Sequence, residues 1–167
     1  MQTTAMLQPI LLRKSYRKED SIMADRYDAL KLENQLCFPL YACTKEIVKA
    51  YKPYLDELNL TYTQYIAMMV MWEHKELCVK DVGKYLFLDS STLTPLLKRL
   101  EEKGYVARRR STEDERELIV TITDIGEALK EKAIVVPERL GACVAIDPQK
   151  AHTLYALLYE VIGNLAR

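Results

Sequence analysis

A cluster of hydroxyl side chains, followed closely by basic ones, is the part of this sequence whose residue types most clearly suggest a chemical role. The cluster consists of Ser90, Ser91, Thr92 and Thr94 and the basic residues Lys98 and Arg99. If these residues lie on a helix, hydroxyl and basic groups near its N-terminus can reach base edges and phosphates in the major groove of DNA. The unpaired amides of a helix N-terminus also favour a phosphate. The cluster therefore predicts a DNA-reading helix, and an ordinary helical hairpin with a solvated face is the alternative.

The charge of the chain is concentrated locally. The whole sequence has 24 basic and 24 acidic residues, so its net charge is zero. Residues 96–110 contain six basic residues against two acidic ones, a local net charge of +4. A chain coated in basic residues is excluded, but a local basic segment is sufficient for DNA binding.

The four cysteines form no recognisable metal or disulfide pattern. Cys37, Cys43, Cys78 and Cys143 are scattered without a CxxC pair, and the chain has only two histidines. This composition predicts no metal site and no cofactor. On residue type alone, each cysteine is expected to be a small buried hydrophobic residue.

Length and composition indicate an ordinary globular chain with an unusual N-terminus. The 167 residues are 49% hydrophobic and 29% charged, which suits one domain with a real core. No apolar run reaches the length of about 18 residues that suggests a membrane span. Met6–Leu12 is short and lacks a signal-peptide cleavage pattern, so the chain is expected to be cytoplasmic. Residues 1–22 lack periodicity and are predicted to be a flexible extension of a domain that spans 23–167.

Helical periodicity and capping signals predict the elements that position the cluster. Thr61 and Gln64 form a capping box that opens an apolar helix ending at His74, which should be central. A short amphipathic helix over 79–86 follows, and then a helix that Asp89 or Ser90 caps and that ends at Gly104. Earlier in the chain, Pro39 indicates either a kinked helix or the start of a second one.

After Gly104 the pattern changes from helical to alternating. Residues 105–110 and 118–123 predict a β-hairpin with a charged tip. Arg116 at that tip and Arg108 in the first strand are candidate DNA contacts, Arg116 in the minor groove or on the backbone. Further helices are expected over 126–136, ending before Pro137, and from Asp147-Pro148 to Leu165. The fold class is mainly α with a small β-hairpin, a winged helix-turn-helix whose DNA-binding core spans about 58–123.

From about Leu32 to Lys132 the sequence resembles the MarR family, and within it the organic-hydroperoxide-sensing repressors known as OhrR. The segments that carry the resemblance are KLENQLCF (31–38), LYACTKEIVKAYKP (40–53), LNLTYTQY (58–65), LDSSTLTPLLKRLEEKG (88–104) and RRRSTEDERE (108–117). The resemblance implies a MarR-like homodimer held together by helices from both chain ends. It also implies that the homodimer binds a palindromic double-stranded DNA operator and acts as a repressor there until the signal arrives.

The resemblance also assigns a role to Cys37. It matches the peroxide-sensing cysteine of these repressors, and Tyr51 and Tyr62 match the tyrosines whose hydroxyls stabilise its thiolate. An organic hydroperoxide would oxidise Cys37 to a sulfenic acid that then forms a disulfide. Cys143 lies roughly where some relatives keep a resolving cysteine, whereas others use a small thiol. Cys43 and Cys78 are expected to be packing residues.

Two other functions remain open on the sequence. A MarR-type regulator could instead sense a phenolic ligand in a pocket at the dimer interface, and would then respond without Cys37. A thiol peroxidase would use Cys37 for catalysis, but no histidine or arginine motif surrounds that cysteine, and we therefore expect no enzyme.

Overall fold

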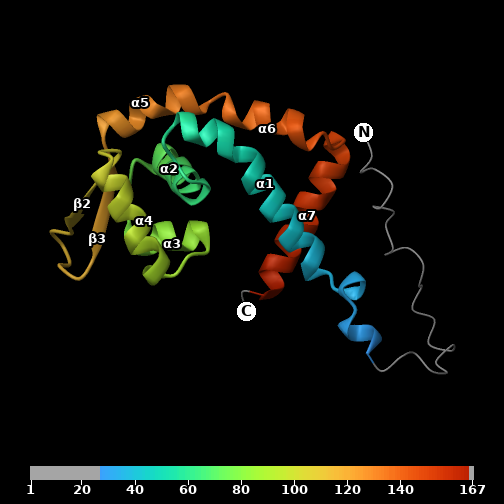
Figure 1. The fold of residues 1–167 in the computed structure, drawn as a ribbon. Helices are drawn as coiled ribbons and strands as arrows, with labels where there is room; N and C mark the ends of the chain where they lie inside the picture. The colour runs from blue at the N-terminus through green and yellow to red at the C-terminus, as the bar shows by residue number, and fades with distance from the viewer. Residues whose placement is uncertain (1–26, 166–167) are drawn as a thin grey trace. The chain divides into compact units, whose positions relative to one another are not determined.

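The computed structural model describes residues 27–165 of the chain, which consist mainly of helices with one small sheet (Figure 1). In chain order the elements are η2 (Asp28–Leu30), η3 (Leu32–Asn34), α1 (Cys37–Glu57), α2 (Tyr62–His74), β1 (Glu76–Cys78), α3 (Val79–Leu86), α4 (Ser90–Glu102), β2 (Val106–Arg110), β3 (Leu118–Ile122), α5 (Asp124–Ala133), α6 (Val136–Val144) and α7 (Pro148–Leu165). The chain divides into two compact units, 1–47 and 48–167. The predicted extension at 1–22 lies outside the described residues.

The first unit contains two short 3-10 helices and the beginning of α1. Asn34 Nδ2 donates to the carbonyl oxygen of Asp28 at 2.8 Å, which ties η3 to η2. Because α1 begins at Cys37, Pro39 lies in its first turn, where a helix makes no use of the amide that proline lacks. Of the two possibilities that Pro39 left open, the start of a new helix is therefore confirmed.

The helix-turn-helix of the second unit follows the predicted elements closely. The capping box of α2 is present, with Gln64 N donating to Thr61 Oγ1 at 3.4 Å and Thr61 N donating to Gln64 Oε1 at 3.1 Å. Met68 and Met71 on α2 are fully buried, as expected for a central helix. The short helix α3 has the predicted bounds, and α4 ends just before Gly104, whose φ of +74° suits glycine.

The sheet has one strand more than the sequence predicted. Its strand order is β1-β3-β2, antiparallel throughout, and Leu77 of β1 pairs with Val120 of β3. The prediction of a two-stranded hairpin was incomplete, because a strand of three residues is too short for alternation to show. β2 and β3 form the wing itself, with Arg108 opposite Val120.

The segment after the wing also differs from its prediction. One helix over 126–136 was expected to end before Pro137, but α5 ends at Ala133 and a new helix, α6, starts at Val136. Pro137 lies in the first turn of α6, so it begins a helix instead of following one. The last helix, α7, has the predicted bounds, and its N-terminus is capped by Asp147 Oδ1, which accepts from Gln149 N at 3.0 Å.

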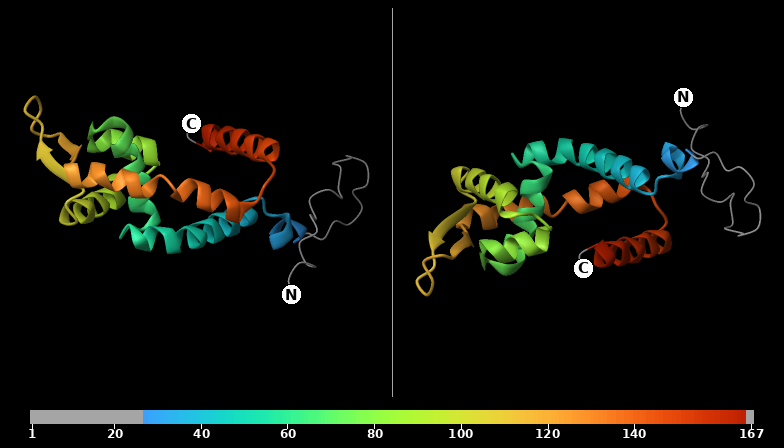
Figure 2. Two further views of the ribbon diagram at one scale, coloured as in Figure 1. Left: turned by 90° about the horizontal axis from the view of Figure 1, so that it is seen from above. Right: turned by 90° about the horizontal axis from the view of Figure 1, so that it is seen from below.

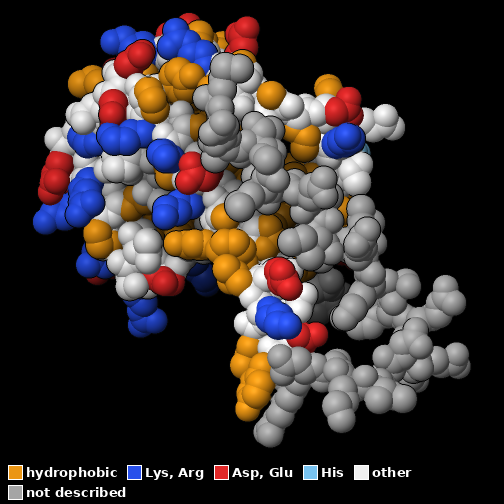
Figure 3. All heavy atoms as spheres, turned by 45° about the vertical axis from the view of Figure 1, so that its right-hand side comes forward, with side chains coloured by type: hydrophobic (Ala, Val, Ile, Leu, Met, Phe, Trp, Pro, Cys, Tyr) orange, Lys and Arg blue, Asp and Glu red, His pale blue; other side chains and the backbone are white. Residues whose placement is uncertain are grey.

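One hydrophobic core joins the end of α1, α2, α3, α4, the sheet, α5 and the start of α6. Trp72 Nε1 donates to the carbonyl oxygen of Gly126 at 2.8 Å, and at Gly126 an added Cβ would lie 2.0 Å from the Tyr105 carbonyl oxygen. The helix α7 takes no part in this core, since none of its residues is buried and both views of Figure 2 show it apart from α2, α3 and α4. Large hydrophobic side chains are also exposed on the surface of the single chain, between charged ones (Figure 3). Among residues 27–165 no helix is long and apolar enough to cross a membrane.

Candidate DNA interface and thiol site

The N-terminus of α4 is fixed by a side-chain cap. Asp89 Oδ1 accepts from the amide of Thr92 at 2.9 Å and from Ser91 Oγ at 2.6 Å. The Ser91 hydroxyl, followed by the Thr92 amide, lowers the pKa of Asp89 below its ordinary value. Leu93 and Leu97 bury the opposite face of the helix in the core. The capped end of α4 therefore presents its polar face to solvent, as a DNA-reading helix requires.

The side chains predicted to contact DNA on α4 are all exposed, but their hydroxyls differ in what they already bind. Ser91 Oγ is engaged with Asp89, and Thr94 Oγ1 donates to the carbonyl oxygen of Ser90 at 2.7 Å. Within residues 27–165, the hydroxyl of Ser90 makes no such bond, whereas the hydroxyl of Thr92 faces Asp89 and helps to lower the pKa of its carboxyl. The Ser90 hydroxyl is thus available to donate to a base or a phosphate.

The basic side chains further along α4 are open to solvent. Lys98 lies one turn before Glu102, with 4.0 Å between Lys98 Nζ and Glu102 Oε1. Arg99 is exposed as well and makes no ion pair with any described residue. Both cations can therefore reach a phosphate without breaking a close contact.

The wing arginines occupy different environments. Arg116 at the tip is exposed, and its amide donates to Asp114 Oδ1 at 2.9 Å. Arg108 instead points toward α4, where its Nε and Nη2 donate to Glu101 Oε2 at 2.9 and 2.7 Å. This ion pair lowers the pKa of the Glu101 carboxyl, first through the hydrogen bond from the Arg108 side chain. The guanidinium of Arg108 is therefore engaged within the protein, whereas Arg116 is free to meet DNA.

Tyr51 and Tyr62, the two tyrosines assigned to the thiol site, lie against each other. Their ring centroids are 5.0 Å apart, and Tyr65 extends the cluster at 5.8 Å from Tyr51. Burial, and then the neighbouring tyrosines, raise the pKa of Tyr51 to about 12. At neutral pH the Tyr51 hydroxyl therefore keeps its proton and can donate it to an anion.

The two cysteines of interest lie in different units. Cys37 is the first residue of α1 in the first unit, and its side chain is exposed. Cys143 lies on α6 in the second unit, with its sulfur 3.6 Å from the hydroxyl of Tyr54. Because Tyr51, Tyr62 and Cys143 all belong to the second unit, their proximity to Cys37 stays a prediction.

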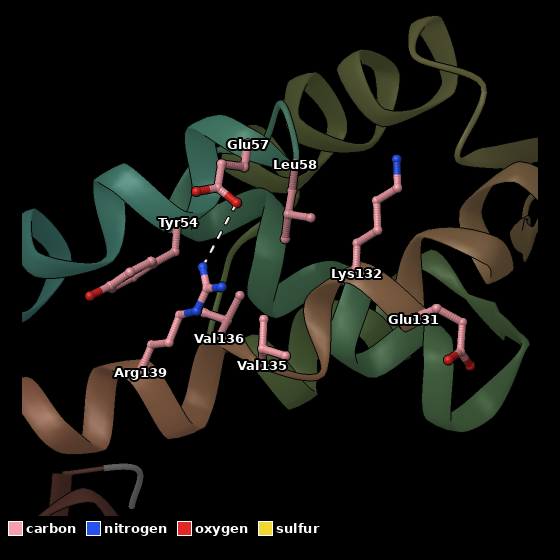
Figure 4. A pocket seen from close by; sticks show the side chains of 8 residues that line it. All are labelled: Tyr54, Glu57, Leu58, Glu131, Lys132, Val135, Val136 and Arg139. Atoms are coloured by element: carbon pink, nitrogen blue, oxygen red, sulfur yellow. Dashed lines mark ion pairs between the residues drawn. The ribbon is translucent and has the colours of Figure 1, made fainter.

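A small pocket of about 280 Å³ opens between the end of α1, α5 and α6 (Figure 4). Arg139 crosses it, with Nη1 at 3.9 Å from Glu57 Oε2 and Cζ at 5.8 Å from the centroid of the Tyr54 ring.

The sequence analysis singled out neither Tyr54 nor Glu101, since the partners of both side chains are fixed only by the tertiary fold. Among the described residues, no group of three His, Cys, Asp or Glu side chains is placed to hold a metal.

Comparison with known proteins is consistent with this geometry. Residues 49–133 match the family described as transcriptional regulator SarA/Rot. The chain is 47% identical to the organic hydroperoxide resistance transcriptional regulator of Bacillus subtilis, over 86% of this chain and 97% of the relative. It is also similar to AbfR of Staphylococcus epidermidis, which has been solved bound to DNA in two states. For reduced AbfR the TM-score is 0.70 at 32% identity, over 86% of this chain and 100% of AbfR. For overoxidized AbfR it is 0.69 at 33% identity, over 84% and 99%.

Proposed function

This chain belongs to the MarR/SarA family as a DNA-binding transcriptional regulator of the OhrR type, and from that premise we propose that it is a cytoplasmic, homodimeric repressor that organic hydroperoxides release from DNA through Cys37. The paired tyrosines Tyr51 and Tyr62 are the observation that supports this proposal most directly. They are the residues assigned to the sensor thiolate, they lie side by side, and Tyr51 keeps its proton at neutral pH. Two tyrosines packed ring against ring supply two hydroxyl donors for a thiolate.

The sensing reaction needs only the thiolate and the signal. The Cys37 thiolate attacks an oxygen of the hydroperoxide, the O–O bond breaks, and the alkoxide takes a proton to leave as an alcohol. Cys37 is then a sulfenic acid. The Cys143 thiolate attacks the sulfur of this sulfenic acid to form the Cys37–Cys143 disulfide, and the oxygen leaves as hydroxide and takes a proton to become water. The hydroperoxide is the oxidant for the whole sequence, so no further reagent is required.

We assign release from DNA to the disulfide and not to the oxidation of a single cysteine. AbfR has been solved on DNA in both the reduced and the overoxidized state, and separately with a disulfide formed. In this chain a disulfide would join Cys37 at the start of α1 to Cys143 on α6. Such a covalent bond would constrain the elements next to the helix-turn-helix, whereas a lone sulfenic acid would not.

The exposed apolar surface of the terminal helices supports a homodimer. On α7 the side chains of Tyr155, Leu157 and Tyr159 are all more than half exposed in the single chain. In the first unit Leu30 and Leu36 are similarly exposed. A helix with this much apolar surface is expected to bury it against a partner. A second copy of the chain would cover these surfaces and would place two α4 helices on the half-sites of a palindromic operator, about 34 Å apart.

The test is fluorescence anisotropy of the full-length protein on DNA from upstream of its own gene, with and without cumene hydroperoxide. We expect tight binding when reduced, loss of at least about tenfold in affinity on oxidation, and recovery with dithiothreitol. Cys37→Ser should bind DNA and ignore the oxidant. Cys43→Ser is the matched control, because Cys43 is an exposed cysteine on the same helix and should respond like the wild type.

The tyrosines provide a second test. Tyr51→Phe or Tyr62→Phe should slow formation of the Cys37 sulfenic acid by about tenfold, the effect of one hydrogen bond to a charged group. Dimedone trapping followed by mass spectrometry measures this rate directly. Continued release of the Cys37→Ser variant by hydroperoxide would contradict the proposal and would favour a ligand sensor instead.

A further inference from the structure

The hydroxyl of Tyr54 lies 3.6 Å from the sulfur of Cys143, a contact between residues 89 positions apart in the chain. We propose that Tyr54 is the positioning residue for the resolving thiol: it holds Cys143 and donates a hydrogen bond to its thiolate while that thiolate attacks oxidised Cys37. This inference rests on the resolving role assigned to Cys143 under the proposed function. It gives a role to Tyr54, which is not one of the two sensor tyrosines and was not singled out from the sequence.

The ring of Tyr54 is held in place by α6. Arg139, one helical turn before Cys143, lies over the ring at 5.8 Å from its centroid and pairs loosely with Glu57 of α1 at 3.9 Å. Figure 4 shows Tyr54, Glu57 and Arg139 together at this junction. Buried Leu55 and Val136 belong to the common core on these two helices. The hydroxyl of Tyr54 thus meets the sulfur between two helices, α1 and α6, and not from a loop.

The proton of this hydrogen bond is on the tyrosine when the sulfur is a thiolate. The hydrogen bond with Cys143 is the first cause that raises the pKa of Tyr54 above its ordinary value, and the opposing effect of Arg139 is smaller. The Tyr54 hydroxyl therefore stays protonated at neutral pH and can donate to a sulfur anion. The thiolate is the nucleophile, and a donor at this position can hold it in place for its attack on oxidised Cys37.

The step that Tyr54 assists is the second half of the sensing reaction. The Cys143 thiolate attacks the sulfur of the Cys37 sulfenic acid, the S–S bond forms, and the S–O bond breaks. The leaving hydroxide takes a proton and becomes water. The hydroperoxide is already fully reduced in the first step; in this one the Cys143 sulfur supplies the electron pair of the S–S bond, so Cys143 is oxidised, the sulfenic sulfur of Cys37 is reduced and no further oxidant is needed. Tyr54 should therefore act on disulfide formation and leave the oxidation of Cys37 unchanged.

The experiment follows both steps in full-length protein treated with one equivalent of cumene hydroperoxide. Dimedone trapping measures the sulfenic acid, and mass spectrometry of unreduced peptides measures the disulfide. In Tyr54→Phe, which keeps the ring beneath Arg139, we expect sulfenic acid at the wild-type rate but disulfide formed about tenfold more slowly at neutral pH. Tyr85→Phe is the matched control, because it removes an exposed tyrosine hydroxyl on α3 and should change neither rate.

A second measurement does not depend on Cys37. In the reduced Cys37→Ser background, peptide-resolved alkylation of Cys143 by iodoacetamide should be several-fold slower with Tyr54→Phe than with Tyr54 intact. Equal disulfide rates and equal alkylation would overturn the inference. A Cys143→Ser protein that still forms a dithiothreitol-reversible product at the wild-type rate would instead remove Cys143 from the proposed function, whatever Tyr54 does.

Discussion

The guanidinium of Arg108 on β2 and the carboxylate of Glu101 on α4 form an ion pair that fastens the wing to the recognition helix. Arg108 Nε and Nη2 both donate to Glu101 Oε2, and the Arg108 amide donates to Glu101 Oε1 at 2.9 Å. The Arg108 side chain is only 18% exposed, so this contact is more sheltered than the other ion pairs of the second unit. The position of the wing relative to α4 therefore depends on a specific pair of charges.

The first prediction is that Arg108 and Glu101 contribute to DNA binding as a pair. Arg108→Ala and Glu101→Ala should each weaken operator binding, and the double variant should be little worse than either single one. A coupling of about 1 kcal/mol is expected, near the upper end for a partly exposed ion pair. Anisotropy titrations of the four proteins give this double-mutant cycle. Arg116→Ala combined with Glu101→Ala is the control, and the two losses of binding free energy should be additive, because Arg116 is at the wing tip. Additive losses in the Arg108 cycle would instead show that Arg108 contacts DNA directly.

The second prediction concerns acid stability. The folded pKa of Glu101 is lowered from its ordinary value of 4.5, so the folded state binds this proton less readily than the unfolded state. The contribution of the ion pair is therefore present in full above pH 4.5 and is lost as the pH falls through the lower, folded pKa. In urea titrations at a series of pH values, the wild type should lose stability more steeply than Glu101→Gln as the pH falls from 4.5 through the folded pKa of Glu101. Parallel curves for the two proteins would contradict the assignment.

Local signals explain why the helix-turn-helix could be predicted from the sequence. The capping box of Thr61 and Gln64, the Asp89 cap and the glycine after α4 are each fixed by side chains within four residues of the helix end. Each helix therefore carries its own boundary. The same holds for α7, whose start is fixed by Asp147.

The features that escaped prediction depend on partners far away in the sequence. Strand β1 exists because Leu77 pairs with Val120, and three residues carry no alternation of their own. The break between α5 and α6 was misplaced, because Pro137 is as compatible with the first turn of a helix as with the residue after one. The contact of Tyr54 with Cys143 depends on how α1 packs on α6, which no local pattern encodes.

The third prediction tests the packing of α5 under the wing. A Cβ at Gly126 would lie 2.0 Å from the Tyr105 carbonyl oxygen, a backbone atom that cannot move aside without displacing the start of the wing. Gly126→Ala should therefore destabilise the protein by about 3 kcal/mol, the upper range for overpacking. Urea denaturation followed by circular dichroism measures the loss.

Gly141→Ala on α6 is the matched control. No described atom lies within 4 Å of its added Cβ, so alanine should stabilise the helix by up to about 0.8 kcal/mol through helix propensity alone. Equal effects of the two substitutions would mean that Gly126 is not packed against Tyr105 in solution.

The last prediction separates phosphate contacts from general charge on α4. Arg99 is exposed on the polar face of this helix, so a phosphate is its expected partner on DNA. Arg99→Ala should weaken binding to operator and unrelated DNA alike, and the slope of log affinity against log salt should become shallower by about one. Lys52→Ala is the control, because it removes the same charge from α1 and not from α4. Lys52 pairs there with Asp56, 2.8 Å away. An unchanged salt slope for Arg99→Ala would place Arg99 off the DNA backbone, whereas a loss confined to the operator would make it a base contact.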